Sequence, residues 1–88
     1  MVPNPQPIRL SFHAKLQCKE RGASEAEVIE AIRRGVREPA KKDRWAYRLN
    51  FGFDSDWQGK RYAVKQVCPV VIEKSDEIVV VTVYTFYF

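Results

Sequence analysis

The chain has 88 residues, of which 45% are hydrophobic and 30% charged, with a formal net charge of +4 at pH 7. This composition indicates one small globular domain and excludes a disordered or multidomain chain. Cys18 and Cys68 lie far apart without a Cys or His partner nearby, so we expect no metal site, no cofactor and no disulfide framework.

The excess of Lys and Arg points to nucleic acid or another acidic partner, and a solvated basic surface is the alternative. Residues 1–7 contain three prolines at alternate positions, which predicts a flexible lead-in. The chain start lacks a charged stretch followed by an apolar core, so it does not resemble a signal peptide. We therefore expect a cytoplasmic protein that does not enter a membrane.

Residues 11–35 predict a helical hairpin. Ser11 is a candidate N-cap, Gly22 a candidate stop, and Ser24 with Glu27 forms the capping-box signature of a second helix. Ile8-Arg9-Leu10, ahead of the hairpin, is compatible with a short strand or with the run into the helix. The apolar side chains expected to cover the rest of the fold are Phe12, Leu16, Cys18, Val28, Ala31, Ile32 and Val36.

Residues 44–88 predict an antiparallel sheet of three or four strands. From Arg44 onward apolar and polar residues alternate with a period of two, as in a half-buried strand. Another strand is expected over 60–67. The β-branched and aromatic run 78–88 is expected to form a strand, with 78–86 as one of the longest strands of the sheet. Segment 37–43 is read as a charged link. The expected fold is a single α+β domain with the hairpin on one face of the sheet.

Strand alternation divides the expected sheet into a covered face and an open face. The side chains expected under the helices are Trp45, Tyr47, Leu49, Phe51, Val79, Val81 and Val83. The side chains expected on the open face are Arg44, Arg48, Arg61, Lys65, Thr82 and Tyr84. Cations around a tyrosine can hold phosphates and stack a base, so Arg44, Arg48, Arg61 and Lys65 are the predicted nucleic-acid-binding residues. The alternative is a face that Arg and Lys merely keep soluble.

The order of several short motifs resembles the bacterial family called domain of unknown function 4258. The motifs are Ser11-x-His13-Ala14, Arg21-Gly22-x-Ser24, Val28-x-x-Ala31-Ile32-x-x-Gly35 and Val80-Val81-Thr82-Val83-Tyr84. That family looks like a branch of the RelE/ParE toxin superfamily, whose members pack an N-terminal helical hairpin on an antiparallel sheet. The resemblance covers roughly residues 8–86 and implies this fold.

RelE-like proteins cleave mRNA on the ribosome, and ParE-like proteins poison DNA gyrase. The resemblance therefore implies a toxin-like RNA-interacting protein, a metal-independent endoribonuclease controlled by an antitoxin. A non-catalytic protein-interaction module and a gyrase-directed protein are the alternatives. Gln17 replaces an arginine common in relatives, and the chain ends in aromatic rather than basic residues, which argues against a vigorous nuclease. The aromatic end also predicts a homodimer or an antitoxin complex.

Cleaving RNA without a metal needs a base, cations for the phosphorane and an acid for the leaving oxygen. The candidate catalytic residues are His13, Arg48, Lys65 and Tyr84. The alternative for His13 is a structural hydrogen bond that locks the hairpin to the sheet. Arg21 is expected to cap carbonyls or pair with an acid, and Trp57 is either a lid over the core or an exposed contact.

Overall fold

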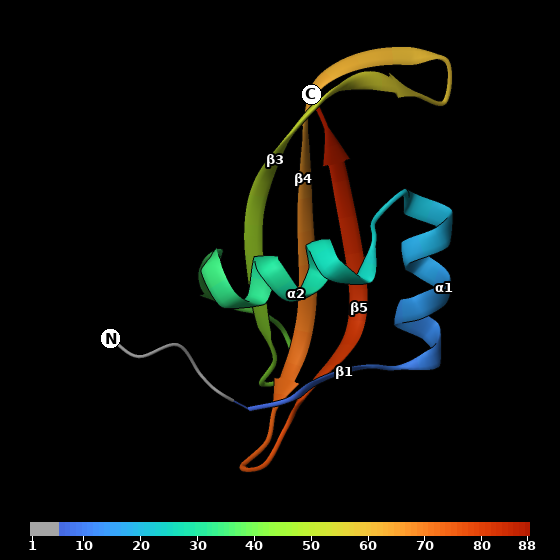
Figure 1. The fold of residues 1–88 in the computed structure, drawn as a ribbon. Helices are drawn as coiled ribbons and strands as arrows, with labels where there is room; N and C mark the ends of the chain where they lie inside the picture. The colour runs from blue at the N-terminus through green and yellow to red at the C-terminus, as the bar shows by residue number, and fades with distance from the viewer. Residues whose placement is uncertain (1–5) are drawn as a thin grey trace.

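The computed structural model describes residues 6–88 and has two helices and a five-stranded mixed sheet (Figure 1). The elements are β1 (Ile8–Leu10), α1 (Phe12–Arg21), α2 (Glu25–Arg34), β2 (Val36–Pro39), β3 (Trp45–Trp57), β4 (Lys60–Glu73) and β5 (Ile78–Tyr87). The strands lie in the order β1-β5-β4-β3-β2. The expected lead-in over 1–7 lies outside the described residues, except for Gln6 and Pro7. Those two are held in place, because the Ile78 N–H donates to Pro7 O at 2.9 Å and Arg33 donates to Gln6 O.

The α+β class is confirmed, but the sheet differs from the expected three or four antiparallel strands. β1 is parallel to β5 and adds a strand that the sequence left undecided. β2 begins at Val36 and takes up residues 37–39 of the expected link, and it pairs antiparallel with β3 at the outer edge of the sheet. A strand with Pro39 and several charges is tolerated there because an edge strand needs partners on one side only.

Both helices begin and end where their capping residues predict. The Ser11 hydroxyl accepts the Ala14 N–H at 3.1 Å, and Gly22 ends α1 in the left-handed conformation. The Ser24 and Glu27 side chains form the complete capping box of α2. The helices do not lie side by side as a tight hairpin. α1 packs against β5 and β1, whereas α2 crosses β4 and β3 on one face of the sheet (Figure 1).

The core forms where α1 and α2 meet the covered face. Its buried members are Leu10, Ala14, Cys18, Val28, Ile32, Tyr47, Val67, Val71, Ile78, Val80 and Val83. The prediction that Phe12 and Leu16 are covered is wrong, because Phe12 is 77% exposed and Leu16 is 44% exposed. α1 instead buries Ala14, Gln17 and Cys18, the face that lies against β5.

A bulge in β5 changes which of its valines enter the core. Val80 pairs with Val71 while Thr82 pairs with Val70, so Val81 is an extra residue that reverses the alternation. The β5 side chains of the core are Ile78, Val80 and Val83. Val83 is therefore placed as predicted. Val79 is buried as predicted but lies outside the cluster that contains Ile78, Val80 and Val83, and Val81 is only partly buried.

α1 closes the edge of β5 that β1 leaves open. β1 pairs only with Ile78–Val80. Beyond it, the Val83 N–H donates to Gln17 Oε1 at 2.8 Å, and the Arg21 guanidinium donates to Val83 O at 2.7 Å. The Thr85 and Tyr87 hydroxyls donate to Arg21 O at 2.8 and 2.6 Å. Side chains thus supply hydrogen bonds that a neighbouring strand would otherwise provide.

β2 is fastened to the sheet by a small polar network around Glu73. Arg37 and Tyr47 both donate to the Glu73 carboxylate, and the Arg37 guanidinium lies 3.4 Å from the Trp45 ring centroid. The hydrogen bond from Arg37, followed by that from Tyr47, lowers the pKa of Glu73. Burial, followed by the Glu73 carboxylate, raises the pKa of the Tyr47 hydroxyl.

This network predicts a pH-dependent loss of stability. Because the folded pKa of Glu73 lies below the usual value of 4.5, its contribution is complete above that value and is lost as pH falls through the folded pKa. We expect Glu73→Gln to cost about 1–3 kcal/mol at pH 7. In urea titrations the gap between the two proteins should narrow as pH falls below 4.5. A gap that stays constant from pH 7 to pH 3 would contradict the assignment.

Candidate nucleic-acid interface

The open face of the sheet is the face that lies away from α2, turned away from the viewer in Figure 1. It carries exposed aromatic side chains on β5. Tyr84 pairs with Cys68 and Phe86 pairs with Gln66, which places all four side chains on this face. Tyr84 and Phe86 are each 44% exposed. The Arg21 and Arg48 guanidinium carbons lie 5.2 and 5.6 Å from the Tyr84 and Phe86 ring centroids. Two exposed rings on a sheet face form a surface on which bases can stack.

Cations gather beside Tyr84 at the turn between β2 and β3. A cavity of about 280 Å³ lies there. We define the open-face site as five of its lining residues, which are Lys41, Lys42, Arg44, Thr82 and Tyr84. Within residues 6–88, no ion pair includes Lys41, Lys42 or Arg44. These three cations are therefore available to neutralise phosphates.

The backbone of this turn is unusual. Lys42 and Asp43 have φ values of 61° and 59°, and the Arg44 N–H donates to Lys41 O at 3.3 Å. This is the geometry of a tight hairpin turn that Asn-Gly would adopt more readily. Residues other than Gly are strained in this region of φ and ψ, so the pairing of β2 with β3 must hold the turn in place. The turn presents the three cations at the open face.

The open face holds two of the four predicted nucleic-acid-binding cations, Arg44 and Arg48. Arg48 is partly engaged, since it bonds Glu38 and donates to Gln66 Oε1 at 3.0 Å. Arg61 is paired with Asp54 at 2.8 Å in the β3–β4 hairpin. The open face also holds Lys41 and Lys42, which lie in the segment expected to be a charged link.

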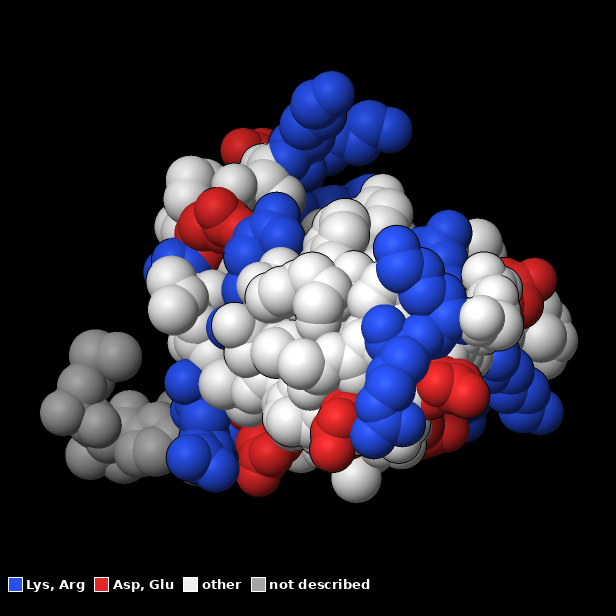
Figure 2. Space-filling model, turned by 90° about the horizontal axis from the view of Figure 1, so that it is seen from above, with Lys and Arg blue, Asp and Glu red and all other residues white. Residues whose placement is uncertain are grey.

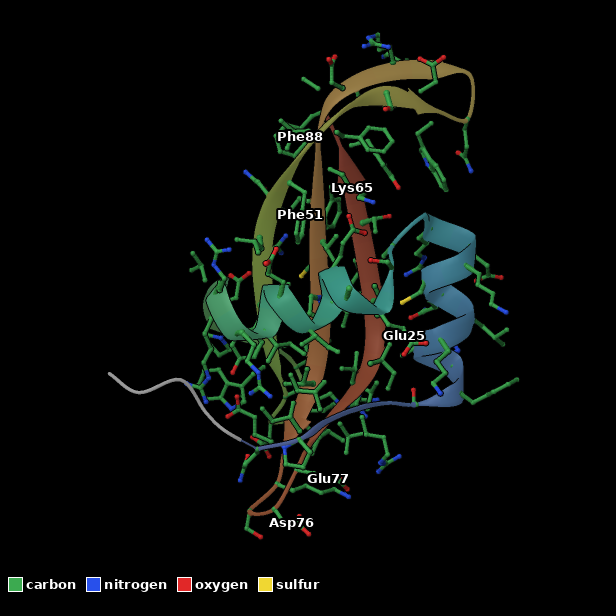
Figure 3. The ribbon with its side chains drawn as sticks, in the orientation of Figure 1. Glu25, Phe51, Lys65, Asp76, Glu77 and Phe88 are labelled. Carbon is green, nitrogen blue, oxygen red and sulfur yellow. The ribbon has the colours of Figure 1, made fainter. Side chains whose placement is uncertain are left out.

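The prediction that Lys65 lies on the open face is wrong. Lys65 is 7% exposed and points from β4 toward the turn between the helices (Figure 3). Its Nζ donates to Gly22 O and to Glu27 Oε1, both at 2.8 Å. Lys65 shares its face with the core residue Val67, two positions on. In the sequence, Val67 and Val71 alternate in phase with Lys65, and this pattern could have indicated that Lys65 lies on the covered face.

We predict that Lys65 stabilises the fold and does not contact ligand. Replacing it with Met removes the ammonium from the Gly22 carbonyl and from the Glu27 carboxylate, which then keeps only the Ser24 N–H of the capping box. We expect a loss of about 2–3 kcal/mol, less than for a fully buried pair because Glu27 is 24% exposed. Thermal or urea unfolding measures this loss. A change under half a kcal/mol would contradict the buried pair, and Lys60→Met, at an exposed β4 position, is the matched control.

The four candidate catalytic residues do not meet at one point. Arg48 and Tyr84 lie on the open face, and Lys65 lies beneath the helices. His13 is exposed in the first turn of α1, and no hydrogen bond or ion pair within residues 6–88 joins it to the other three. Their catalytic roles stay predictions.

A second cavity lies where the β3–β4 hairpin approaches the end of α1. A register shift between Gly52 and Ser55 accompanies the bend of the hairpin toward α1 in Figure 1. Trp57 stacks on Tyr87 with ring centroids 4.9 Å apart. The cavity measures about 280 Å³ and is lined by Glu20, Arg21, Trp57, Gln58, Tyr84, Thr85 and Tyr87. The sequence does not decide between a lid and an exposed contact for Trp57. It also gives no sign of the contact with Tyr87, because the two rings meet only through the bend of the hairpin.

Tyr84 connects the two cavities, because its ring borders both. The Arg21 guanidinium carbon lies 5.2 Å from the Tyr84 ring centroid. Figure 2, viewed from the end where the hairpin and the C-terminus lie, shows Lys and Arg bordering a central area without charged side chains, with acidic groups between them. Within residues 6–88, Lys15 and Lys19 on α1 also form no ion pair. What distinguishes the open-face site is therefore that its cations lie beside the exposed ring of Tyr84.

Fold and site together define a small α+β protein with helices on one sheet face and an aromatic, cationic site on the other. A family model described as Domain of unknown function (DUF4258) matches residues 10–85. The chain belongs to that family, the one that its motifs resemble. No curated protein and no solved structure matches it. Among the described residues, no helix is long and apolar enough to cross a bilayer, and no group of three or more His, Cys, Asp or Glu side chains could hold a metal.

Proposed function

We propose that the protein binds single-stranded RNA across the open face of its sheet. The observation that carries this proposal is the coincidence of three unpaired cations, Lys41, Lys42 and Arg44, with the exposed rings of Tyr84 and Phe86. Cations along a groove track the phosphates, and aromatic rings on a sheet stack successive bases. A single strand fits this pairing because its bases are free to leave the helix stack.

The proposal includes placement of the family in the RelE/ParE toxin superfamily. It is supported by the two N-terminal helices and by the antiparallel run β2-β3-β4-β5. RNA is the ligand in the RelE branch, which makes RNA a better match than gyrase for an open face with stacking rings. The proposed role is binding, because a metal-independent cleavage would need base, acid and cations around one phosphate.

Salt dependence tests this proposal. With three phosphates contacted, log K for an all-uridine RNA should fall against log salt with a slope of about −2, from roughly 0.7 per phosphate. Arg44→Ala should reduce the slope by about 0.7 and weaken binding to all sequences alike. Tyr84→Ala should cost about 1–3 kcal/mol with little change in slope, as expected for a lost stacking partner.

Arg61→Ala is the matched control, because Arg61 is already paired with Asp54 at the hairpin. It should leave the slope and the affinity nearly unchanged. Fluorescence anisotropy of labelled RNA across a salt series gives all of these values. Absence of binding at low salt, or binding that survives the combined loss of Lys41, Lys42 and Arg44, would refute the proposal.

A second candidate function, binding of an antitoxin-like protein, is favoured by the outer surface of α1. Phe12 and Leu16 are exposed one turn apart and line a cavity of about 300 Å³ with Lys15 and Lys19. The first turn of α1 has no acidic residue. An amphipathic helix with acidic flanks would match this apolar stripe and its lysines.

Co-expression with the product of the adjacent reading frame tests the second function. Phe12→Ser and Leu16→Ser should each abolish co-elution in size-exclusion chromatography, because they remove apolar contact area. Tyr84→Ala, on the opposite face of the sheet, should leave co-elution intact. Loss of the complex with Tyr84→Ala alone would place the partner on the open face instead.

A further inference from the structure

We infer that the cavity between α1 and the β3–β4 hairpin takes one guanine base of the bound strand. This inference rests on the proposed function and names its base preference. It is carried by the lining of that cavity, in which aromatic rings, an anchored arginine and an unpaired carboxylate surround one space.

The aromatic part of the lining suits a planar base. Trp57 and Tyr87 are stacked with an interplanar angle of 14°, and both border the cavity together with Tyr84. Tyr87 also contacts the Phe53 and Tyr62 rings, so its role is to hold Trp57 in place. The rings of Trp57 and Tyr84 are the stacking surfaces for an unstacked base. The volume of about 280 Å³ is at the small end of ligand pockets, which fits a single base better than a whole dinucleotide.

Glu20 gives the cavity its chemical preference. It is exposed in the last turn of α1, where the helix dipole disfavours a negative charge. Within residues 6–88 its carboxylate forms no ion pair or hydrogen bond. A carboxylate accepts hydrogen bonds only. Guanine presents two adjacent donors, N1–H and N2–H, on its Watson–Crick edge. Adenine and cytosine present one donor beside an acceptor, and uracil presents one donor between two acceptors. The carboxylate also disfavours a phosphate in this cavity.

Arg21 completes the recognition of guanine. One guanidinium N–H is used by Val83 O, which fixes the side chain over Tyr84. Arginine has five N–H donors, so others remain for the O6 and N7 acceptors of guanine. Gln58, at φ 51° in the hairpin turn, adds an amide at the rim.

The position of the cavity joins it to the open-face site. Tyr84 borders both, so a strand whose phosphates lie on Lys41, Lys42 and Arg44 passes the mouth of the guanine cavity at Tyr84. One base can leave the stack there while its neighbours stay on the sheet.

The test compares four RNAs of eight nucleotides. One contains uridine only, and each of the other three has a single central guanosine, adenosine or inosine among uridines. The wild-type chain should bind the guanosine RNA roughly tenfold tighter than the adenosine RNA, as for a bidentate base contact. Inosine lacks the N2 amino group and should lie between them. Glu20→Gln should bring the guanosine and adenosine affinities together while leaving all-uridine affinity unchanged or slightly higher.

Glu25→Gln is the matched control, because it makes the same charge change on exposed surface and does not line this cavity. It should keep the guanosine preference. Equal binding of guanosine and adenosine RNA by the wild-type chain, or a preference that Glu20→Gln leaves intact, would overturn the inference while the RNA-binding function stands.

Titration with GMP, followed by NMR at the Trp57 indole N–H, separates the remaining outcomes. A shift with GMP but not AMP, together with no RNA binding, would refute the proposed function and retain the cavity as a site for the free nucleotide. No response to GMP and no RNA binding would refute both.

Discussion

The hydrogen bonds between α1 and the edge of β5 determine how the rest of this structure is arranged. β1 satisfies only the first residues of that edge, so the backbone of Val83 needs partners from elsewhere. Gln17 and Arg21 supply an acceptor and a donor at 2.8 and 2.7 Å. Gln17 is nearly buried and could not be replaced by arginine in this role, because a guanidinium has no acceptor. The role of Gln17 in this fold is thus structural.

This arrangement also decides which surfaces remain for ligands. α1 lies along β5 while α2 crosses β4 and β3, so both helices leave the opposite face of the sheet uncovered (Figure 1). Lys65 also ties β4 to the helices, because its Nζ donates to Gly22 O at the turn between α1 and α2. The bend of the β3–β4 hairpin then brings Trp57 to Tyr87 and close to Gly22, where any side chain would collide with the ring. The outcome is an open face bordered at one corner by an aromatic cavity.

Local signals in the sequence predicted the helices well, because caps act through neighbouring residues. As expected, α1 begins after Ser11 and ends at Gly22, and α2 begins at the Ser24–Glu27 capping box. The alternation of β3 correctly placed Arg48 on the open face. The predictions were wrong where strand pairing depends on residues far apart in the sequence. The extra residue at Val81 reversed the β5 pattern, and the charged segment before Trp45 gave no hint of β2.

The candidate site was predictable only in part for the same reason. Tyr84 and Arg44 belong to strand patterns that the sequence reveals, whereas Lys41 and Lys42 reach the open face through a strained turn. Glu20, Arg21 and Trp57 meet only because of the edge closure and the hairpin bend, both of which are long-range contacts.

The most direct test of this account is an NMR titration of the labelled protein with a single-stranded RNA. Amide shifts should concentrate at Thr82 and Tyr84 and in the turn from Lys41 to Arg44. The outer surface of α1 around Phe12 and Leu16 should show no change. Shifts centred on Phe12 and Leu16, with the β5 amides unchanged, would contradict the assignment of the open face as the binding surface.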